Sequence, residues 1–240
     1  MEFFILEPAG GQIFGTKWAY GDKVEPILLG EPRSCPVCGR TLSLLEWLPP
    51  HRVKLSSAKP DKWGDFIWVL GALAVSERFQ EIYRAEGLTG IEHFYPAMEI
   101  VRVGTRKTGD LPEGLPAYSM VKIKWNGANL DDAGSEVIRK DNPLRCTFDR
   151  GPVRAYERVV LEPGSWDSSD IFQARGLLAV TIVSERFRDV VKKHGLTNAW
   201  FIPAKNYAYR EAGGWYVRNS NESDEPTLTS RGKRQPPKTG

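Results

Sequence analysis

The sequence contains little of what several common classes of protein require. It has three cysteines in 240 residues, too few and too unevenly spaced for the disulfide framework of a small secreted domain. No apolar run approaches the roughly 18 residues of a membrane-spanning helix. The opening residues, MEFFIL, lack the basic segment and the small-residue cleavage site of a signal peptide. These absences predict a soluble, cytoplasmic protein that does not enter a membrane.

Catalytic motifs are also missing from the sequence. It shows no nucleophile elbow, no phosphate-binding glycine loop and no HExxH helix. Of the three histidines, His194 is expected in the last turn of a helix, where a cation interacts favourably with the helix dipole. His93 is expected in a strand, and His51 in a loop. We therefore predict no catalytic residue and no cofactor-binding residue, and we do not expect an enzyme.

The net charge of +3 gives no strong electrostatic signal. Residues 219–240 carry part of the excess, with Arg231, Lys233, Arg234 and Lys238 against Glu222, Asp224 and Glu225, a net of 4 − 3 = +1. The remainder of the chain is close to neutral, without the basic surface that nucleic-acid binding requires. Nucleic acid is therefore not the expected partner.

What the sequence does contain is an internal repeat. SERF at 76–79 recurs at 184–187, a shift of 184 − 76 = 108 residues, and GLT at 87–89 recurs at 195–197 with the same shift. FYPA at 94–97 corresponds to FIPA at 201–204, and weaker similarity relates 1–6 to 120–125 and 32–35 to 143–146. The two segments are interpreted as diverged copies of one unit.

Each copy predicts the same order of elements. Apolar strands over 73–75 and 181–183 lead into Ser76 and Ser184, which are good helix N-caps, and a glutamate follows in the first turn. A glycine suited to the left-handed position ends each helix, and a strand comes next. The predicted fold class is α+β: a tandem pseudo-repeat of two similar units, each mostly antiparallel sheet with one main capped helix.

The same comparison predicts the domain organisation. Repeat unit 1 spans 1–104 and contains a CPVCG knuckle, and a linker follows at 105–117. Repeat unit 2 spans 118–218 and contains a degenerate CxxD knuckle. The basic tail, 219–240, is rich in Ser, Pro, Gly and charge and is predicted to be disordered.

The CPVCG motif is the most specific chemical signal in the chain. Cys35 and Cys38 have the spacing at which two thiolates of a knuckle bind one zinc ion, and the following glycine lets the backbone turn. In the second copy, Cys146 and Asp149 stand where a second knuckle would be. A tetrahedral zinc site needs four ligands, so one structural zinc held by Cys35, Cys38, Cys146 and Asp149 is the principal hypothesis.

Three other interpretations of these residues stay open. The three cysteines could bind zinc with His51 or another group as the fourth ligand, the site could have decayed to ordinary packing without metal, or the CxxC could be a redox-active dithiol. The tryptophans are assigned more simply. Trp18, Trp47 and Trp125, set among polar or proline-rich neighbours, are candidates for a partner surface. Core positions are expected for Trp63, Trp68, Trp166, Trp200 and Trp215.

Together these residues resemble the double-CXXCG motif family of myxobacterial proteins, which are regarded as immunity proteins against secreted toxins. The first cysteine motif is matched at 35–39 and the terminal block at 170–172, 183–187 and 195–197. The second cysteine motif is incomplete, since Asp149 replaces a cysteine. The resemblance implies a cytoplasmic immunity protein of bacterial competition that neutralises a cognate toxin by occluding it or holding it inactive. Two alternatives are a zinc-knuckle nucleic-acid-binding protein and an enzyme with a dispersed site.

Overall fold

The structure is a computed structural model, and it describes residues 1–8, 18–107, 110–140, 146–211 and 213–217. The fold is mostly β, with 39% strand and 12% helix. The described residues contain two α-helices, α1 (Glu77–Ala85) and α2 (Glu185–Lys193), and two short 3-10 helices, Pro60–Lys62 and Ala204–Asn206. Neither α-helix is long and apolar enough to cross a membrane. The predicted tail, 219–240, lies outside the described residues.

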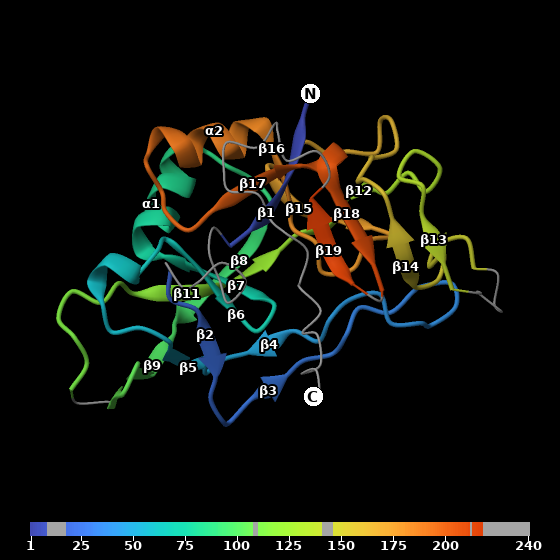
Figure 1. Cartoon of the computed structure of the whole chain (residues 1–240). Helices are drawn as coiled ribbons and strands as arrows, with labels where there is room; N and C mark the ends of the chain where they lie inside the picture. Colours follow the sequence, from blue (N-terminus) through green and yellow to red (C-terminus); the bar gives the residue numbers. More distant parts are fainter. Residues whose placement is uncertain (9–17, 108–109, 141–145, 212, 218–240) are drawn as a thin grey trace, which may run out of the picture.

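The strands form four sheets (Figure 1). The largest contains β2 (Gly21–Lys23), β5 (Arg52–Leu55), β6 (Phe66–Val69), β7 (Ala72–Ser76), β8 (Ile91–Ala97), β9 (Glu99–Val103), β10 (Arg106–Lys107) and β11 (Tyr118–Ile123). Their spatial order is β10-β9-β5-β2-β6-β7-β11-β8.

A second sheet contains β1 (Phe3–Glu7), β12 (Trp125–Asn129), β15 (Ile171–Arg175), β16 (Ile182–Ser184) and β17 (Trp200–Pro203), in the order β12-β15-β16-β1-β17. The third sheet contains β13 (Ile138–Arg139), β14 (Val153–Tyr156), β18 (Tyr207–Arg210) and β19 (Gly214–Val217). Its strands lie side by side in the order in which they occur in the sequence. The smallest pairs β3 (Leu28–Leu29) with β4 (Trp47–Leu48).

The predicted α+β fold class, a tandem pseudo-repeat of two similar units, each mostly antiparallel sheet with one main capped helix, is wrong. Helix is a minor component, and the two segments do not each close their own sheet. β1 lies between β16 and β17 of the second segment, and β11 of that segment lies between β7 and β8 of the first. The two segments therefore exchange a strand. Hydrophobic alternation marks a strand as half-buried but does not say which strand it pairs with, which is why the sequence did not reveal the exchange.

Buried carboxylates lock the exchanged segments together. Asp65 accepts hydrogen bonds from the Ser76 hydroxyl at 2.8 Å and from the Thr197 N–H and hydroxyl at 2.8 and 3.0 Å. Arg78 forms a salt bridge with the same carboxylate at 3.1 Å and donates to the carbonyl oxygen of His194. One aspartate thus joins the start of α1 to the turn that follows α2.

Asp170 makes the reciprocal set of contacts. It accepts from the Ser184 hydroxyl at 2.8 Å and from the Thr89 N–H and hydroxyl at 3.0 and 3.2 Å. Arg186 pairs with it at 2.8 Å and donates to the carbonyl oxygen of Gly87. The Ser–Glu–Arg motifs therefore have a structural role, because each arginine contacts both segments.

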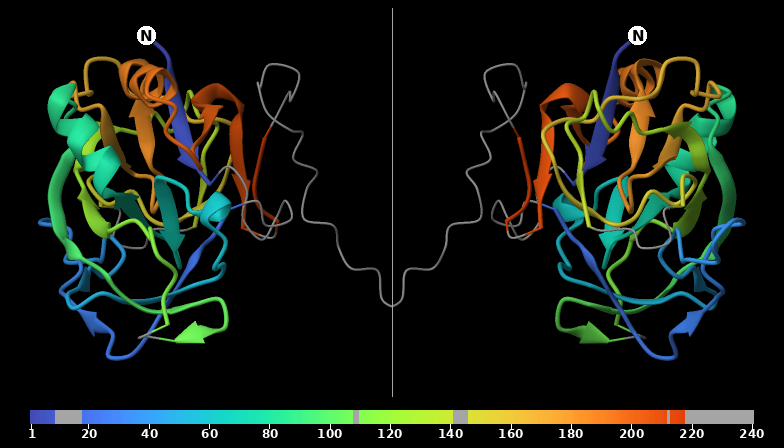
Figure 2. Two further views of the ribbon diagram at one scale, coloured as in Figure 1. Left: turned by 90° about the vertical axis from the view of Figure 1, so that its left-hand side faces the viewer. Right: turned by 90° about the vertical axis from the view of Figure 1, so that its right-hand side faces the viewer.

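The helices themselves begin as the serines predict. Ser76 accepts from the N–H of Phe79, and Ser184 accepts from the N–H of Phe187, both at 3.1 Å. Phe79 and Phe187 are fully buried, with ring centroids 6.0 Å apart, so both helices cover one shared core. The views in Figure 2 place α1 and α2 together at one end of the molecule.

The tryptophans expected in the core do contribute to it. Trp200 is buried, and the other four are partly buried and pack against core clusters: Trp63, Trp68, Trp166 and Trp215. Of the three candidates for a partner surface, Trp47 is 5% exposed and belongs to the core. Trp18 and Trp125 are partly exposed.

Candidate metal centre and adjoining grooves

The first knuckle is a tight hairpin between two bridged residues, Ser34 and Thr41. The N–H of Cys35 donates to the carbonyl of Arg40 at 2.7 Å, and the N–H of Gly39 donates back to the carbonyl of Cys35 at 2.9 Å. Gly39 has φ +73°, a left-handed conformation that suits glycine. The N–H of Val37 points at the Cys35 sulfur, 3.4 Å away. This is the backbone arrangement by which a knuckle stabilises thiolates.

The degenerate motif adopts the same turn. The N–H of Arg150 donates to the carbonyl of Cys146 at 3.0 Å, and the N–H of Asp149 points at the Cys146 sulfur at 3.4 Å. Arg150 occupies the place of Gly39, with the same offset of 150 − 39 = 146 − 35 = 111, and has φ +59°. A left-handed conformation costs a non-glycine residue roughly 1–2 kcal/mol.

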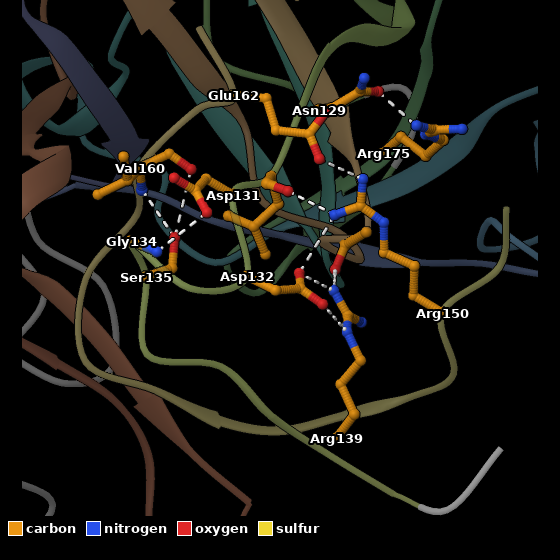
Figure 3. Close-up of polar contacts among 12 residues, drawn as sticks. Asn129, Asp131, Asp132, Gly134, Ser135, Arg139, Arg150, Val160, Glu162 and Arg175 are labelled. Carbon is orange, nitrogen blue, oxygen red and sulfur yellow. Dashed lines mark hydrogen bonds and ion pairs between the residues drawn. The ribbon is translucent and has the colours of Figure 1, made fainter. Parts of the chain in front are cut away.

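Ion pairs and hydrogen bonds of Arg150 offset that cost. Its guanidinium pairs with Asp132 at 3.3 Å and with Glu162 at 2.5 Å (Figure 3). It also donates to the carbonyl oxygen of Leu130. Arg139 binds the same Asp132 through two nitrogens, at 2.6 and 2.7 Å. The second knuckle is therefore anchored by charge where the first relies on glycine.

The two knuckles bring three thiols together. The sulfurs of Cys35, Cys38 and Cys146 all lie within 4.8 Å of one another, and those of Cys35 and Cys146 are 3.7 Å apart. In a zinc tetrahedron with Zn–S bonds of about 2.3 Å, the sulfurs are about 3.8 Å apart. All three cysteines are thiols and none forms a disulfide. The three cysteines therefore form a cluster whose spacing is compatible with a metal ion.

The electrostatics of the cluster favour a cation. Burial acts to raise the pKa of the Cys35 thiol, but donors from Cys38, Val37 and Cys146 outweigh burial and lower it. The pKa of Cys38 is instead raised to about 11. The hydrogen bond from the N–H of Arg40 lowers this pKa, but the combined effect of burial and the other two cysteines, which raise it, is larger. Adding negative charge beside an existing thiolate is unfavourable until a cation neutralises the charge.

Asp149 lies beside the thiols as the sequence comparison predicted. Its Oδ2 is 4.0 Å from the sulfur of Cys38 and 3.1 Å from Nε of Arg40, and its side chain is 7% exposed. His51 lies elsewhere: it is buried against Trp47, whose carbonyl oxygen is 2.9 Å from Nε2. The hypothesis that His51 completes a zinc site is therefore wrong.

Two hollows adjoin this centre. We call the first, about 580 Å³, the leucine groove. It is lined by five exposed leucines: Leu29, Leu44, Leu45, Leu70 and Leu178. We call the second, about 480 Å³, the aromatic pocket. Its walls include the rings of Phe148, Tyr156, Tyr207, Tyr209 and Trp215, and it reaches Arg40 and Asp149.

The two hollows meet at Glu7, Trp125, Leu178 and Ala179, which line both. Trp125, which the sequence suggested as a candidate for a partner surface, therefore lines both hollows, whereas sequence analysis did not single out Glu7. Burial raises the pKa of Glu7 to about 7, partly offset by a 2.9 Å hydrogen bond from the Tyr207 hydroxyl. No sequence signal could have identified Glu7, because 200 residues separate it from Tyr207.

Comparison with known proteins adds no assignment. No protein-family model matches the chain, and no curated protein matches it in sequence. The candidate sites therefore have to be interpreted from their own geometry.

Proposed function

We propose that this chain is an immunity protein: it binds a cognate bacterial toxin in the cytoplasm and neutralises it by occluding it or holding it inactive. The observation that carries the proposal is the leucine groove. Exposed large apolar side chains that gather around one hollow mark a protein-binding surface more often than scattered ones do. The likeness of the cysteine and SERF motifs to the double-CXXCG family supports the same function.

The side chains of the groove suit a protein partner. Its five leucines are between 48% and 69% exposed, so a partner that covers them would gain roughly 1 kcal/mol from each. Trp125 adds an aromatic anchor where the groove meets the aromatic pocket. Charged groups surround this apolar surface, including Glu31, Arg33 and Lys122, and a polar rim around an apolar centre is the usual anatomy of an interface.

We further propose that Cys35, Cys38, Cys146 and Asp149 hold one structural zinc ion. The spacing of the three sulfurs supports this, and Arg40 would balance part of the negative charge of a Cys₃Asp site. Zinc would join the two knuckles, which belong to segments 111 residues apart. Its role would be to fix the loops beside the two hollows.

Coexpression tests the main proposal. The toxin gene that neighbours this one would be expressed with the wild-type protein, with Leu44→Asp and with Leu70→Asp. We expect the wild type to restore growth and to co-purify with the toxin, and both variants to fail. Ile138→Asp is the matched control, because Ile138 is 57% exposed but does not line the groove. A toxin that wild-type protein neither binds nor neutralises would refute the proposal.

A further inference from the structure

The carboxylate of Glu7 lies at the junction of the leucine groove and the aromatic pocket, and no described basic side chain forms an ion pair with it. Within the described part of the chain, its one hydrogen-bond partner is the Tyr207 hydroxyl at 2.9 Å, and it forms no salt bridge. Glu7 ends β1, and its register partner on β17 is the apolar Trp200. A partly buried carboxylate is normally paired with a cation, and the described residues supply none to Glu7.

Aromatic rings surround this position. Tyr207 stacks on Trp215 with centroids 5.6 Å apart and on Tyr156 at 6.2 Å, and Tyr156 stacks on Tyr209 at 5.7 Å. The faces of tyrosine and tryptophan attract cations. A carboxylate beside such a cluster can accept an ammonium or guanidinium group.

The basic residues that line the two hollows are occupied elsewhere. Four of them form salt bridges, in the pairs Lys122–Glu46, Arg33–Glu92, Arg40–Asp149 and Arg139–Asp132. The other two lie over aromatic rings: Lys23 over Trp47 at 4.8 Å, and Arg175 over Phe148 at 4.7 Å, where Arg175 also donates to Asn129. None of these cations has a contact with Glu7, so the basic side chains that line the two hollows in the described part of the chain leave its charge unpaired.

We propose that Glu7 binds a lysine or arginine side chain of the partner protein whose apolar residues occupy the leucine groove. This inference rests on the proposed function and specifies the chemistry of the partner. The leucines would provide apolar contact area, and the salt bridge at Glu7 would provide specificity. Catalysis is the weaker explanation of the carboxyl group, because the other carboxylate lining the aromatic pocket, Asp149, is held by Arg40.

The pH dependence of binding follows from the pKa of Glu7, about 7. The ionised fraction of such a group rises about tenfold between pH 6 and pH 8. We expect the affinity for the toxin, measured by calorimetry, to rise by up to about tenfold over the same range. Glu7→Gln, which keeps the shape and removes the charge, should abolish that rise and weaken binding at pH 8 by about tenfold or more.

Asp61→Asn is the matched control, because Asp61 is an exposed carboxylate, with 70% of its side chain accessible, that lines neither hollow; it should retain the wild-type affinity and pH dependence. If Glu7→Gln binds the toxin as wild type does at both pH values, the inference is wrong although the proposed function stands. If wild-type protein does not bind the toxin at all, the proposed function itself has failed.

A probe without the toxin tests Glu7 directly. Carboxyl ¹³C NMR follows the titration of Glu7, which is assigned by its absence in Glu7→Gln. Ethylguanidinium chloride should lower the titration midpoint of Glu7 progressively, and equal sodium chloride should lower it less. Equal shifts from the two salts would overturn the inference.

Discussion

Replacement of Asp65 by alanine tests how much the contacts of this aspartate stabilise the association of the exchanged segments. The carboxylate accepts four hydrogen bonds, three of them from Ser76 and Thr197 at 2.8 to 3.0 Å and one from Arg78. Alanine leaves the N–H of Thr197 without its acceptor in a region where Asp65 is only 7% exposed. Removal of one partner from a buried charged network costs about 3–5 kcal/mol.

The value for Asp65 should lie toward the lower part of that range. Arg78 is half exposed, with 52% of its side chain accessible, so water can replace its salt bridge at little cost. The loss therefore comes mainly from the three shorter bonds to Ser76 and Thr197. We expect about 3 kcal/mol, which is a large fraction of the roughly 5–15 kcal/mol that stabilises a typical domain.

Urea denaturation followed by tryptophan fluorescence measures this loss. We expect the midpoint to fall by roughly 1 M or more, and Asp170→Ala to cost about as much, because Asp170 makes the reciprocal contacts. Asp61→Ala is the control: its carboxylate is 70% exposed and pairs only loosely with Lys62, at 3.6 Å. The argument is refuted if Asp65→Ala shifts the midpoint no more than Asp61→Ala does.

Three further predictions concern Glu7, the metal centre and one glycine. Because the pKa of Glu7 in the folded protein, about 7, exceeds its ordinary value of 4.5, stability should fall as pH rises from about 4.5 to 7. Glu7→Gln should therefore raise the free energy of unfolding, measured by urea denaturation, by about 1–3 kcal/mol at pH 8 and not at pH 4. Metal analysis should find about one zinc per chain, and Cys146→Ser should remove it and lower the melting temperature by roughly 10 °C. Gly90→Ala should prevent folding, because residue 90 has φ +106° and an added Cβ would lie 1.9 Å from the carbonyl oxygen of Ile171. Gly114→Ala is the control: an added Cβ there would meet nothing within 4 Å, so we expect a loss of only about 1 kcal/mol in thermal denaturation.

The features that sequence analysis predicted correctly are local ones. A serine three residues before a buried phenylalanine defines an N-cap whatever lies beyond it, and Ser76 and Ser184 both cap their helices. The comparison of 35–38 with 146–149 also predicted the proximity of the three thiols, which lie within 4.8 Å of one another. The alignment of 1–6 with 120–125 was less accurate. Phe3 and Tyr118 face Ser184 and Ser76 respectively, so the shift there is 118 − 3 = 115 residues.

The features that sequence analysis missed depend on pairing across the chain. β1 and β11 are short apolar strands with no residue that specifies a partner, and their exchange follows from the competition among all strands for edges. Glu7 gains its raised pKa from that exchange, since β1 carries it into the second segment beside Tyr207. A glutamate at the end of an apolar strand otherwise predicts a solvent-exposed turn.

The exchange of strands and the cysteine cluster stabilise different parts of the molecule. The exchanged strands and the aspartates hold the two sheets beneath the helices, where neither segment can complete its sheet alone. The loops at 35–40 and 146–151 lie outside those sheets, and the first runs directly into Leu44 and Leu45 of the leucine groove. Backbone hydrogen bonds close the hairpin at 35–40 itself, and beyond it the N–H of Leu42 donates to Arg33 and that of Gly30 to Glu46. Under the proposed function, a metal ion at the cysteine cluster therefore matters less for the fold as a whole than for holding those leucines in position, which reduces the entropy lost when a partner binds.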